Sequence, residues 1–359
     1  MRILHVHTSL GDNPSTERSM AIAAALSEGN THSFASAQPV GDAALLQAIH
    51  VLADFPAMSG LPTLGRLQRL VKAMIGYDVV FTYEYGAIDA VMACTAFSSA
   101  FALPPVIHHE CYPEQVSRRS AWYRRIALDK SAALVVAHEP GRQRALTDWQ
   151  QPSGRIAVIP DGIDVSEWRK VPRADILPSL LKRPGEMWIG SSCSILDQNS
   201  LVNLLKAVAQ LTENWQLVLI CEEDGRGLVR REAERLKIVH RVHLPGKPGK
   251  SSRATGLFDI AVFLPNKRSD PFDVIRAMAC ATPIVADPAS AAMATVSAPN
   301  LEFMVSFDRP EELSIALATL AADQNLRRTV GLANADLAQE NHALEGMTRA
   351  YKRLLARIQ

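Results

Sequence analysis

Residues 268–286 read RSDPFDVIRAMACATPIVA, and this stretch decides the fold. Its middle predicts a short helix over Val274–Ala279. Thr282-Pro283 then turns the chain into a wholly apolar strand, predicted over Ile284–Ala286. A helix that leads into a short apolar strand is typical of a parallel sheet buried on both faces by helices.

The same alternation of apolar strands and helical patterns runs outward through the chain, which predicts the α/β class. Further strands are predicted at Ile3–His7, Val79–Thr82, Val106–His108, Ala133–Ala137, Ile156–Ile159, Met187–Ser191, Gln216–Cys221, Arg241–Leu244, Ile260–Leu264 and Phe303–Val305. Further helices are predicted at Arg18–Glu28, Gly65–Ile75, Gly86–Ala102, Arg142–Trp149, Leu201–Leu211, Leu228–Lys237, Pro310–Ala321 and Leu344–Ile358.

The pattern stops and restarts once, which predicts two domains. A polar, proline-bearing stretch at 165–185 separates an N-terminal domain, 1–164, from a C-terminal domain, 165–343. Two α/β halves in tandem predict a ligand cleft at the carboxyl ends of their strands.

Composition excludes several classes of protein. The 359 residues are 48% hydrophobic and carry a net charge of +1, which argues against nucleic acid as a partner. The five cysteines form no C-x-x-C pair, so we expect a reduced, cytoplasmic protein without a zinc knuckle. The uncharged segment 90–107 contains Pro104-Pro105, and we expect a buried helix followed by a strand there, not a membrane span.

Polar residues follow the first strand. Ser15 and Thr16 are good helix N-caps, and a helix N-terminus there would present its positive dipole to a ligand. The segment contains no G-x-G-x-x-G fingerprint, which argues against a dinucleotide-dependent dehydrogenase.

Histidines gather at the predicted strand ends. His5 and His7 share one face of the first strand, and HHE at 108–110 ends another. A metal site is one interpretation. HVHTSLGD also resembles the opening of the polymerase-and-histidinol-phosphatase type of phosphoesterase, although that family's further ligand motifs are absent. We favour histidines that hydrogen-bond a substrate or the backbone, with no metal.

Six segments, in order, resemble the retaining glycosyltransferases of the GT-B fold, which transfer sugars from nucleotide donors. AMACATPIVA at 277–286 is similar to the family's Ala-Met-Ala-Cys-Gly-Thr-Pro-Val-Val-Ala, and VIPDGID at 158–164 to its Ile-Pro-Asn-Gly-Val-Asp. The other four segments are TER at 16–18, HHE at 108–110, LVLICEEDGR at 217–226 and RVHLPG at 241–246.

The resemblance implies two Rossmann-like domains, with the terminal helix, 344–359, completing the first. It implies catalysis at His109 and Glu110, where His109 positions a donor hydroxyl. It implies donor binding by Ser15, Thr16, Gly162, Ser194, Asn199, Gly246, Asp270, Phe272, Arg276 and Thr282. No cofactor or metal is implied beyond the nucleotide-sugar co-substrate.

The sequence departs from the family at its charged donor residues. The family's Arg and Lys fall on Ser194 and Asn199, and one Glu falls on Arg276, while Asp270 could stand in for the other. Since such cations stabilise the leaving diphosphate, Arg276, expected at a helix start, would replace them. The alternative is that Arg276 is a solvated surface residue or pairs with Asp270 or Asp273.

Three readings of function therefore stay open, of which a metal-dependent phosphoesterase that uses the histidine cluster is the most remote. The first is a glycosyltransferase of polysaccharide biosynthesis acting on a saccharide, lipid-linked or other hydroxyl acceptor. The second is a degenerate subunit that binds a homologous partner. The basic segment 117–130, SRRSAWYRRIALDK, either is a solvated helix face or contacts the inner face of an anionic membrane.

Overall fold

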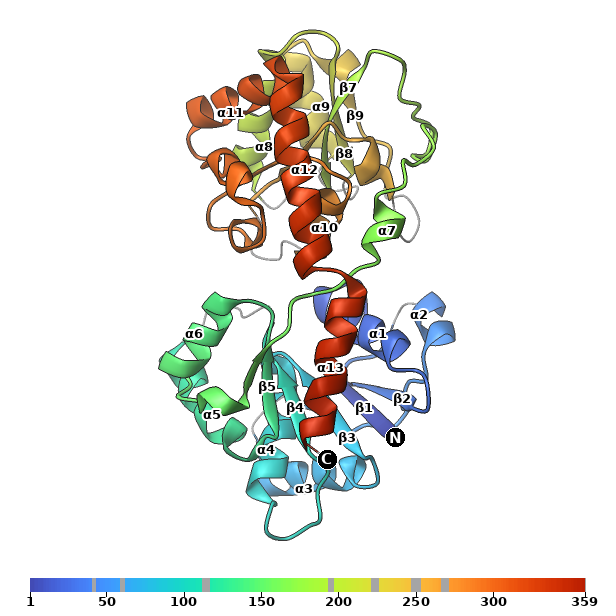
Figure 1. Ribbon diagram of the computed structural model, residues 1–359, viewed down its shortest axis with the longest axis vertical. Helices are drawn as coiled ribbons and strands as arrows, with labels where there is room; N and C mark the ends of the chain where they lie inside the picture. Colours follow the sequence, from blue (N-terminus) through green and yellow to red (C-terminus); the bar gives the residue numbers. More distant parts are fainter. Residues whose placement is uncertain are drawn as a thin grey trace. The chain divides into compact units, whose positions relative to one another are not determined.

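The computed structural model describes residues 1–40, 43–58, 62–111, 117–192, 197–220, 226–246, 253–265 and 271–358. The chain forms two compact units: Met1–Gly162 with Leu344–Gln359, and Ile163–Ala343. Each unit has its own parallel sheet with helices packed against it (Figure 1). The predicted α/β class with two Rossmann-like domains is confirmed.

The first unit contains a six-stranded sheet in the order β2-β1-β3-β4-β5-β6. All of its strand pairs are parallel. Strand β2 is an addition to the prediction, because its half-polar sequence THSFAS carries no apolar run. The strands are β1 Arg2–His7, β2 Thr31–Ser36, β3 Val79–Tyr83, β4 Val106–His109, β5 Ala133–Val136 and β6 Ile156–Val158.

Helices cover both faces of this sheet. Leu70 of α3 and Val91 of α4 pack on one face, whereas Ile22 of α1 and Leu354 of α13 pack on the other. The helices are α1 Pro14–Ala25, α2 Ala43–Ala48, α3 Leu64–Met74, α4 Ile88–Ala96, α5 Arg118–Ala127, α6 Glu139–Thr147 and α13 Leu344–Ile358, with 3-10 turns η1 Tyr85–Ala87, η2 Leu128–Lys130 and η3 Ser153–Arg155.

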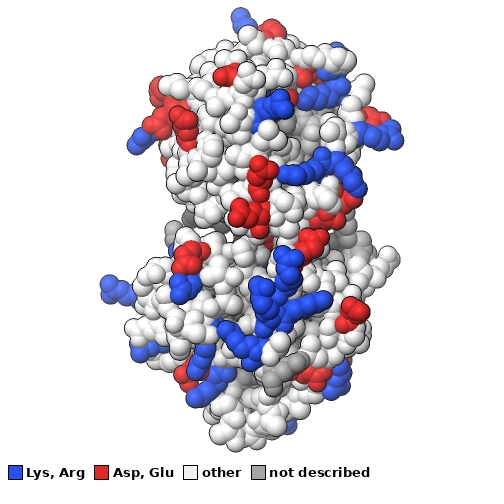
Figure 2. Space-filling model, in the orientation of Figure 1, with Lys and Arg blue, Asp and Glu red and all other residues white. Residues whose placement is uncertain are grey.

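Helix α13 is amphipathic and returns from the far end of the chain to lie beside α1 (Figure 1). Its inner face buries Met347, Tyr351, Leu354 and Leu355 against the sheet. Its outer face is basic, and Figure 2 shows Lys and Arg side chains gathered there; the exposed ones are Arg349, Lys352, Arg353 and Arg357.

The second unit contains five parallel strands in the order β11-β10-β7-β8-β9. The strand predicted at Phe303–Val305 is wrong, because Phe303 ends a 3-10 helix and Met304 makes only an isolated bridge to Ala286. The strands are β7 Met187–Ser192, β8 Trp215–Ile220, β9 Val242–His243, β10 Ile260–Phe263 and β11 Ile284–Ala286.

Helices α8, α9 and α11 bury one face of this second sheet through Leu204, Val229 and Leu317. Helix α12 is an addition to the prediction. The helices are α7 Val165–Trp168, α8 Gln198–Ala209, α9 Arg226–Arg235, α10 Pro271–Ala279, α11 Pro310–Ala322 and α12 Gln324–Asn341, with 3-10 turns η5 Val239–Arg241, η6 Arg253–Leu257, η7 Ala291–Ala294 and η8 Ala298–Phe303.

Within the described ranges, no helix is long and apolar enough to cross a bilayer. The uncharged segment 90–107 contains most of α4, a connecting loop and the first two residues of β4.

Both sheets contain a topological switch point. In the first, the chain leaves β1 for β2 on one side and later adds β3 on the other. In the second, it leaves β7 for β8 and later adds β10 on the opposite side. Open parallel sheets bind ligands at the carboxyl ends of the two strands that flank such a point. We therefore expect ligand-binding residues at the carboxyl ends of β1 and β3 in the first sheet, and of β7 and β10 in the second.

Candidate functional site

Aromatic rings line the carboxyl edge of the first sheet. The ring centroid of Tyr83 lies 4.2 Å from that of His7 and 4.5 Å from that of His109, and both pairs are stacked. The His109 ring also lies 5.9 Å from Tyr351 of α13. The stack spans β1, β3 and β4, so it includes the switch point.

The geometry of His109 fixes its tautomer. Its Nδ1 lies 3.1 Å from the carbonyl oxygen of Thr82 and donates to it, which leaves Nε2 with a lone pair in the neutral ring. Among the described residues, this buried Nε2 has no hydrogen-bond partner. Burial, followed by the nearby charge of Arg18, holds the pKa of His109 well below its usual value. His109 is therefore a neutral hydrogen-bond acceptor.

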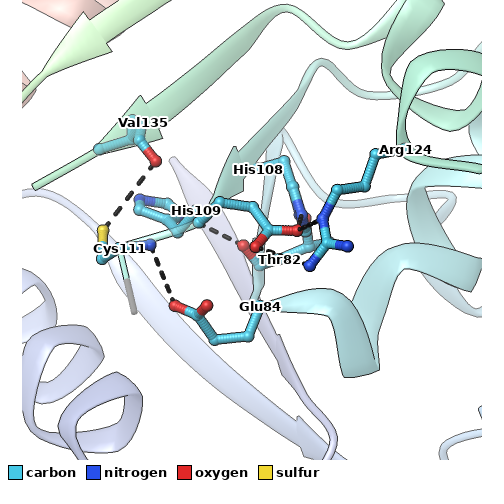
Figure 3. A network of polar contacts seen from close by, with 8 residues as sticks. Thr82, Glu84, His108, His109, Cys111, Arg124 and Val135 are labelled. Atoms are coloured by element: carbon cyan, nitrogen blue, oxygen red, sulfur yellow. Dashed lines mark hydrogen bonds and ion pairs between the residues drawn. The ribbon is translucent and has the colours of Figure 1, made fainter. Parts of the chain in front are cut away.

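Glu110 forms a buried ion pair with Arg124, which is labelled in Figure 3. Arg124 of α5 donates to both carboxylate oxygens, at 2.5 Å and 3.1 Å. His108 lies 3.4 Å from the same carboxylate and 2.7 Å from the hydroxyl of Thr82. Burial would raise the pKa of Glu110, but the hydrogen bonds from His108 and Arg124 hold it below its usual value. This arrangement anchors α5 to β4, and a catalytic role for Glu110 stays a prediction.

The ring nitrogens of His5, on β1, are both occupied by the protein. Tyr83 donates to His5 Nδ1 at 2.8 Å, and His5 Nε2 lies 2.9 Å from His32 Nδ1. The described ranges contain no group of three or more His, Cys, Asp or Glu side chains placed to hold a metal ion.

Asp161 of the PDG turn pairs with Arg18 of α1. The two side chains are buried, and Arg18 Nη1 lies 2.5 Å from the Asp161 carboxylate. Arg18 also donates to the hydroxyl of Tyr351 and to the carbonyl of Ile159. These bonds tie α1, the turn after β6 and α13 together. The donor-binding candidate Gly162 follows Asp161 in this turn and is not among the described glycines with positive φ.

The cap of α1 differs from the prediction. Asn13 is the N-cap, and its side chain accepts a hydrogen bond from the backbone N–H of Thr16. Asn13 precedes Pro14, which is favoured at the first helical position. Ser15 and Thr16 therefore lie inside the first turn, and the Thr16 hydroxyl accepts from the N–H of Gly11 at 3.3 Å.

The carboxyl edge of the second sheet carries a buried hydroxyl. Ser191 near the end of β7 is 1% exposed, and its Oγ has no partner among the described residues. Asp197 caps α8 through two backbone N–H groups, and Asn199 in the first turn is exposed. The candidate residues Ser194 and Asp270 lie outside the described residues.

Helix α10 follows β10 on the other side of this switch point. It begins at Pro271, three residues earlier than predicted, so Phe272 is a buried residue of its first turn. Thr282 is buried just after the helix, and Ala281 before it has φ +57°, a conformation that favours glycine. Gly246, after β9, has φ +84° and does require glycine.

Arg276 lies in the last turn of α10, so the expectation that it starts the helix is wrong. Its guanidinium donates to Asp273 at 3.0 Å and lies 5.3 Å from the ring of Trp168. The structure thus contains the Arg276–Asp273 pair, which the sequence analysis gave as the alternative to diphosphate binding by Arg276. Tyr83 and Glu84, for which the end of β3 was the only signal, were missed in the sequence, and so was the role of Arg124, which lies within α5 and carries no such signal.

Residues 187–323 match the family model described as Glycosyl transferases group 1. HepE of Anabaena in complex with UDP is similar over 99% of this chain and 100% of its own, with a TM-score of 0.78 and 16% identity. Sucrose-phosphate synthase from Thermosynechococcus elongatus covers 100% and 99%, with a TM-score of 0.70 and 17% identity.

UDP-GlcNAc 2-epimerase from Neisseria meningitidis, bound to UDP-GlcNAc, covers 99% of this chain and 100% of its own, with a TM-score of 0.67 and 13% identity. No curated protein sequence matches the chain. At these identities the likeness to solved structures establishes the shared fold.

Proposed function

We propose that this chain, which has the GT-B fold and whose residues 187–323 match the family model described as Glycosyl transferases group 1, transfers a sugar from a nucleoside-diphosphate donor to a hydroxyl acceptor. The observation that carries the proposal is the family match, because it contains both β7 and β10 and hence the switch point of the second sheet. We favour uridine as the base, since HepE is solved with UDP and the epimerase with UDP-GlcNAc.

The N-terminus of α10 is our candidate for holding the diphosphate. Its first-turn N–H groups and its dipole favour an anion. Asp273 is an acidic residue in that turn, and Arg276 lies close enough to neutralise it. We therefore assign Arg276 a supporting role, in which it keeps Asp273 from repelling the donor. The N–H groups would stabilise the charge that develops on the leaving diphosphate.

The first unit would hold the acceptor and orient the donor sugar. In our proposal, Nε2 of His109 accepts a hydrogen bond from a donor hydroxyl, for which its neutral tautomer is suited. We propose transfer with retention. The oxygen–carbon bond to the leaving diphosphate breaks, the acceptor oxygen bonds to the same face of the sugar carbon, and the acceptor proton passes to the leaving phosphate.

A thermal-shift titration with UDP, UDP-glucose and UDP-GlcNAc tests the donor site. A ligand that binds only the native state raises the unfolding midpoint, so UDP should do so and uridine should not. No shift with any nucleotide would contradict the proposal and favour the degenerate subunit that binds a homologous partner. We expect the shift to persist after treatment with EDTA, since no metal is proposed.

His109→Phe and His109→Gln separate positioning from packing. Phe keeps the stacked ring, whereas Gln keeps an acceptor near the place of Nε2. We expect Phe to lower UDP-glucose turnover by ~100-fold, as for loss of one well-placed donor or acceptor group, and Gln to retain more activity. Equal turnover of the native protein and His109→Phe would remove the assignment.

The exposed face of α5 is our candidate for a membrane contact and for lipid-linked acceptors of polysaccharide biosynthesis at the cytoplasmic face. Trp122 is 62% exposed, and Arg118, Arg119 and Arg125 are exposed beside it. Arg124 and Tyr123 are unavailable, because they bind Glu110 and Asp89. Co-sedimentation with vesicles of phosphatidylglycerol, compared with phosphatidylcholine, tests the contact. Binding that ignores the anionic lipid would contradict it.

A further inference from the structure

Glu84 has a backbone conformation that is otherwise almost confined to glycine. It follows β3 directly and has φ 57° and ψ 175°. Non-glycine residues in such regions are strained, and the strain persists only where the surroundings over-determine it. They cluster at sites that bind ligands, so an observed outlier is a reason to ask what the side chain does.

The surroundings of Glu84 fix both its backbone and its carboxylate. Its N–H donates to the carbonyl of His109 at 2.7 Å, and its own carbonyl accepts from the N–H of Ala87 at 3.0 Å. The carboxylate accepts from the N–H of Cys111 at 3.2 Å (Figure 3). The side chain is thereby held at the ends of β3 and β4, although it stays partly exposed.

Gly86, two residues after Glu84, lies where the backbone of this turn approaches Thr8 closely. A Cβ added there would lie 1.7 Å from the hydroxyl oxygen of Thr8. The turn after β3 therefore packs directly on the segment after β1. These two segments flank the switch point of the first sheet, where a ligand is expected.

The chemistry of this edge suits a polyhydroxylated ligand. A carboxylate has two oxygens with about four lone pairs, so Glu84 can accept hydrogen bonds from several groups at once, including ligand hydroxyls beside the N–H of Cys111. His7, on the other side of the switch point, has a buried Nε2 without a partner among the described residues. The stacked rings of Tyr83 and His7 present flat ring surfaces near these hydrogen-bond acceptors.

We infer that Glu84 binds a non-reacting hydroxyl of a saccharide acceptor at the β1–β3 edge, and so selects and orients the acceptor. This inference rests on the proposed function. It assigns Glu84 no proton transfer, because the proton of the reacting hydroxyl passes to the leaving phosphate. The inference explains why a glutamate is found at position 84, where glycine would adopt the same backbone angles with less strain.

Stability measurements test whether the strain is structural or serves a ligand. Glu84→Gly removes both the carboxylate and the strain, whereas Glu84→Ala removes the carboxylate alone. We expect the unfolding midpoint of Glu84→Gly to exceed those of Glu84→Ala and of the native protein. A midpoint of Glu84→Gly below the native one would show that the carboxylate is needed for folding, and would overturn the inference.

Kinetics test the ligand. Glu84→Gln keeps the shape and an oxygen for the N–H of Cys111, and transfer from UDP-glucose to methyl glycosides of glucose, galactose and mannose is measured. We expect kcat/KM for the acceptor to fall by roughly ten- to a hundredfold, the effect of losing a hydrogen bond to a charged group. The KM for UDP-glucose and the thermal shift with UDP should not change.

Glu139→Gln is the matched control, since Glu139 is an exposed carboxylate in the first turn of α6, after β5 and away from the switch point. Equal acceptor kinetics in the native protein and Glu84→Gln would overturn the inference. So would a native protein that responds to UDP but glycosylates none of the three glycosides. Absence of any response to UDP would instead contradict the proposed function.

Discussion

Lowering the pH should destabilise the first unit because its sheet buries neutral imidazoles. Burial lowers the pKa of His7 from 6.5 to about 3. The pKa values of His5 and His109 are also lowered, chiefly by burial. Below pH 6.5 the unfolded chain binds protons at these sites that the folded chain excludes, so stability is complete above that pH and falls below it.

The magnitude follows from proton linkage. One excluded proton changes the free energy of unfolding by about 1.4 kcal/mol per pH unit. Between about pH 6.5 and about pH 5, His7 alone should therefore cost about 2 kcal/mol. His5 and His109 act with the same sign, so the slope of the native protein should exceed that of one proton.

Urea unfolding across this pH range, compared between the native protein and His7→Asn, isolates one of the three sites. Asn does not titrate, so the slope of the variant should be smaller by about 1.4 kcal/mol per pH unit, whatever its absolute stability. Hydrogen exchange of β1 and β3 amides in the same samples assigns the transition to the first unit. Parallel stability curves for the two proteins would refute the reasoning.

Three further substitutions test other contacts. Arg18→Met should cost ~3–5 kcal/mol, since it leaves the buried Asp161 carboxylate without its cation; thermal unfolding measures this, and Arg18→Met with Asp161→Asn should recover part of the loss. Ala281→Gly should raise the free energy of unfolding by about 0.5–1 kcal/mol, because φ +57° suits glycine; an unchanged or lower value would contradict this. Arg276→Met should weaken UDP binding by about 0.5–1 kcal/mol through the unmasked charge of Asp273, and Asp273→Asn in the same chain should restore the affinity measured by calorimetry.

The sequence predicted the strands that carry apolar runs, because burial on both faces requires them. It did not predict β2, whose residues are half polar, or α12, whose long polar face hides a few core positions such as Val330. The order of helix, turn and strand within 271–286 agrees with the prediction, but the helix begins three residues earlier because Pro271 and Phe272 belong to its first turn.

The candidate site was predictable only at the level of strand ends. His109 could be named because it ends β4 in a familiar motif, and Asp273 was one of the two partners considered for Arg276. The contact of Arg276 with the ring of Trp168 could not be predicted, because Trp168 comes from α7. The backbone angles of Glu84 could not be predicted from a single sequence, since they depend on hydrogen bonds with His109 and Cys111, and on the packing of Gly86 against Thr8, that only a folded chain brings together.

The return of α13 to the first unit has a consequence for biosynthesis. On the ribosome, residues 1–162 emerge long before the helix that contributes Met347 and Tyr351 to their core. Until then Ile3, Phe81 and Val135 lack that cover. We expect the nascent first unit to expose part of its core, so that chaperones bind it and proteases cleave it, until α13 has been made after the second unit.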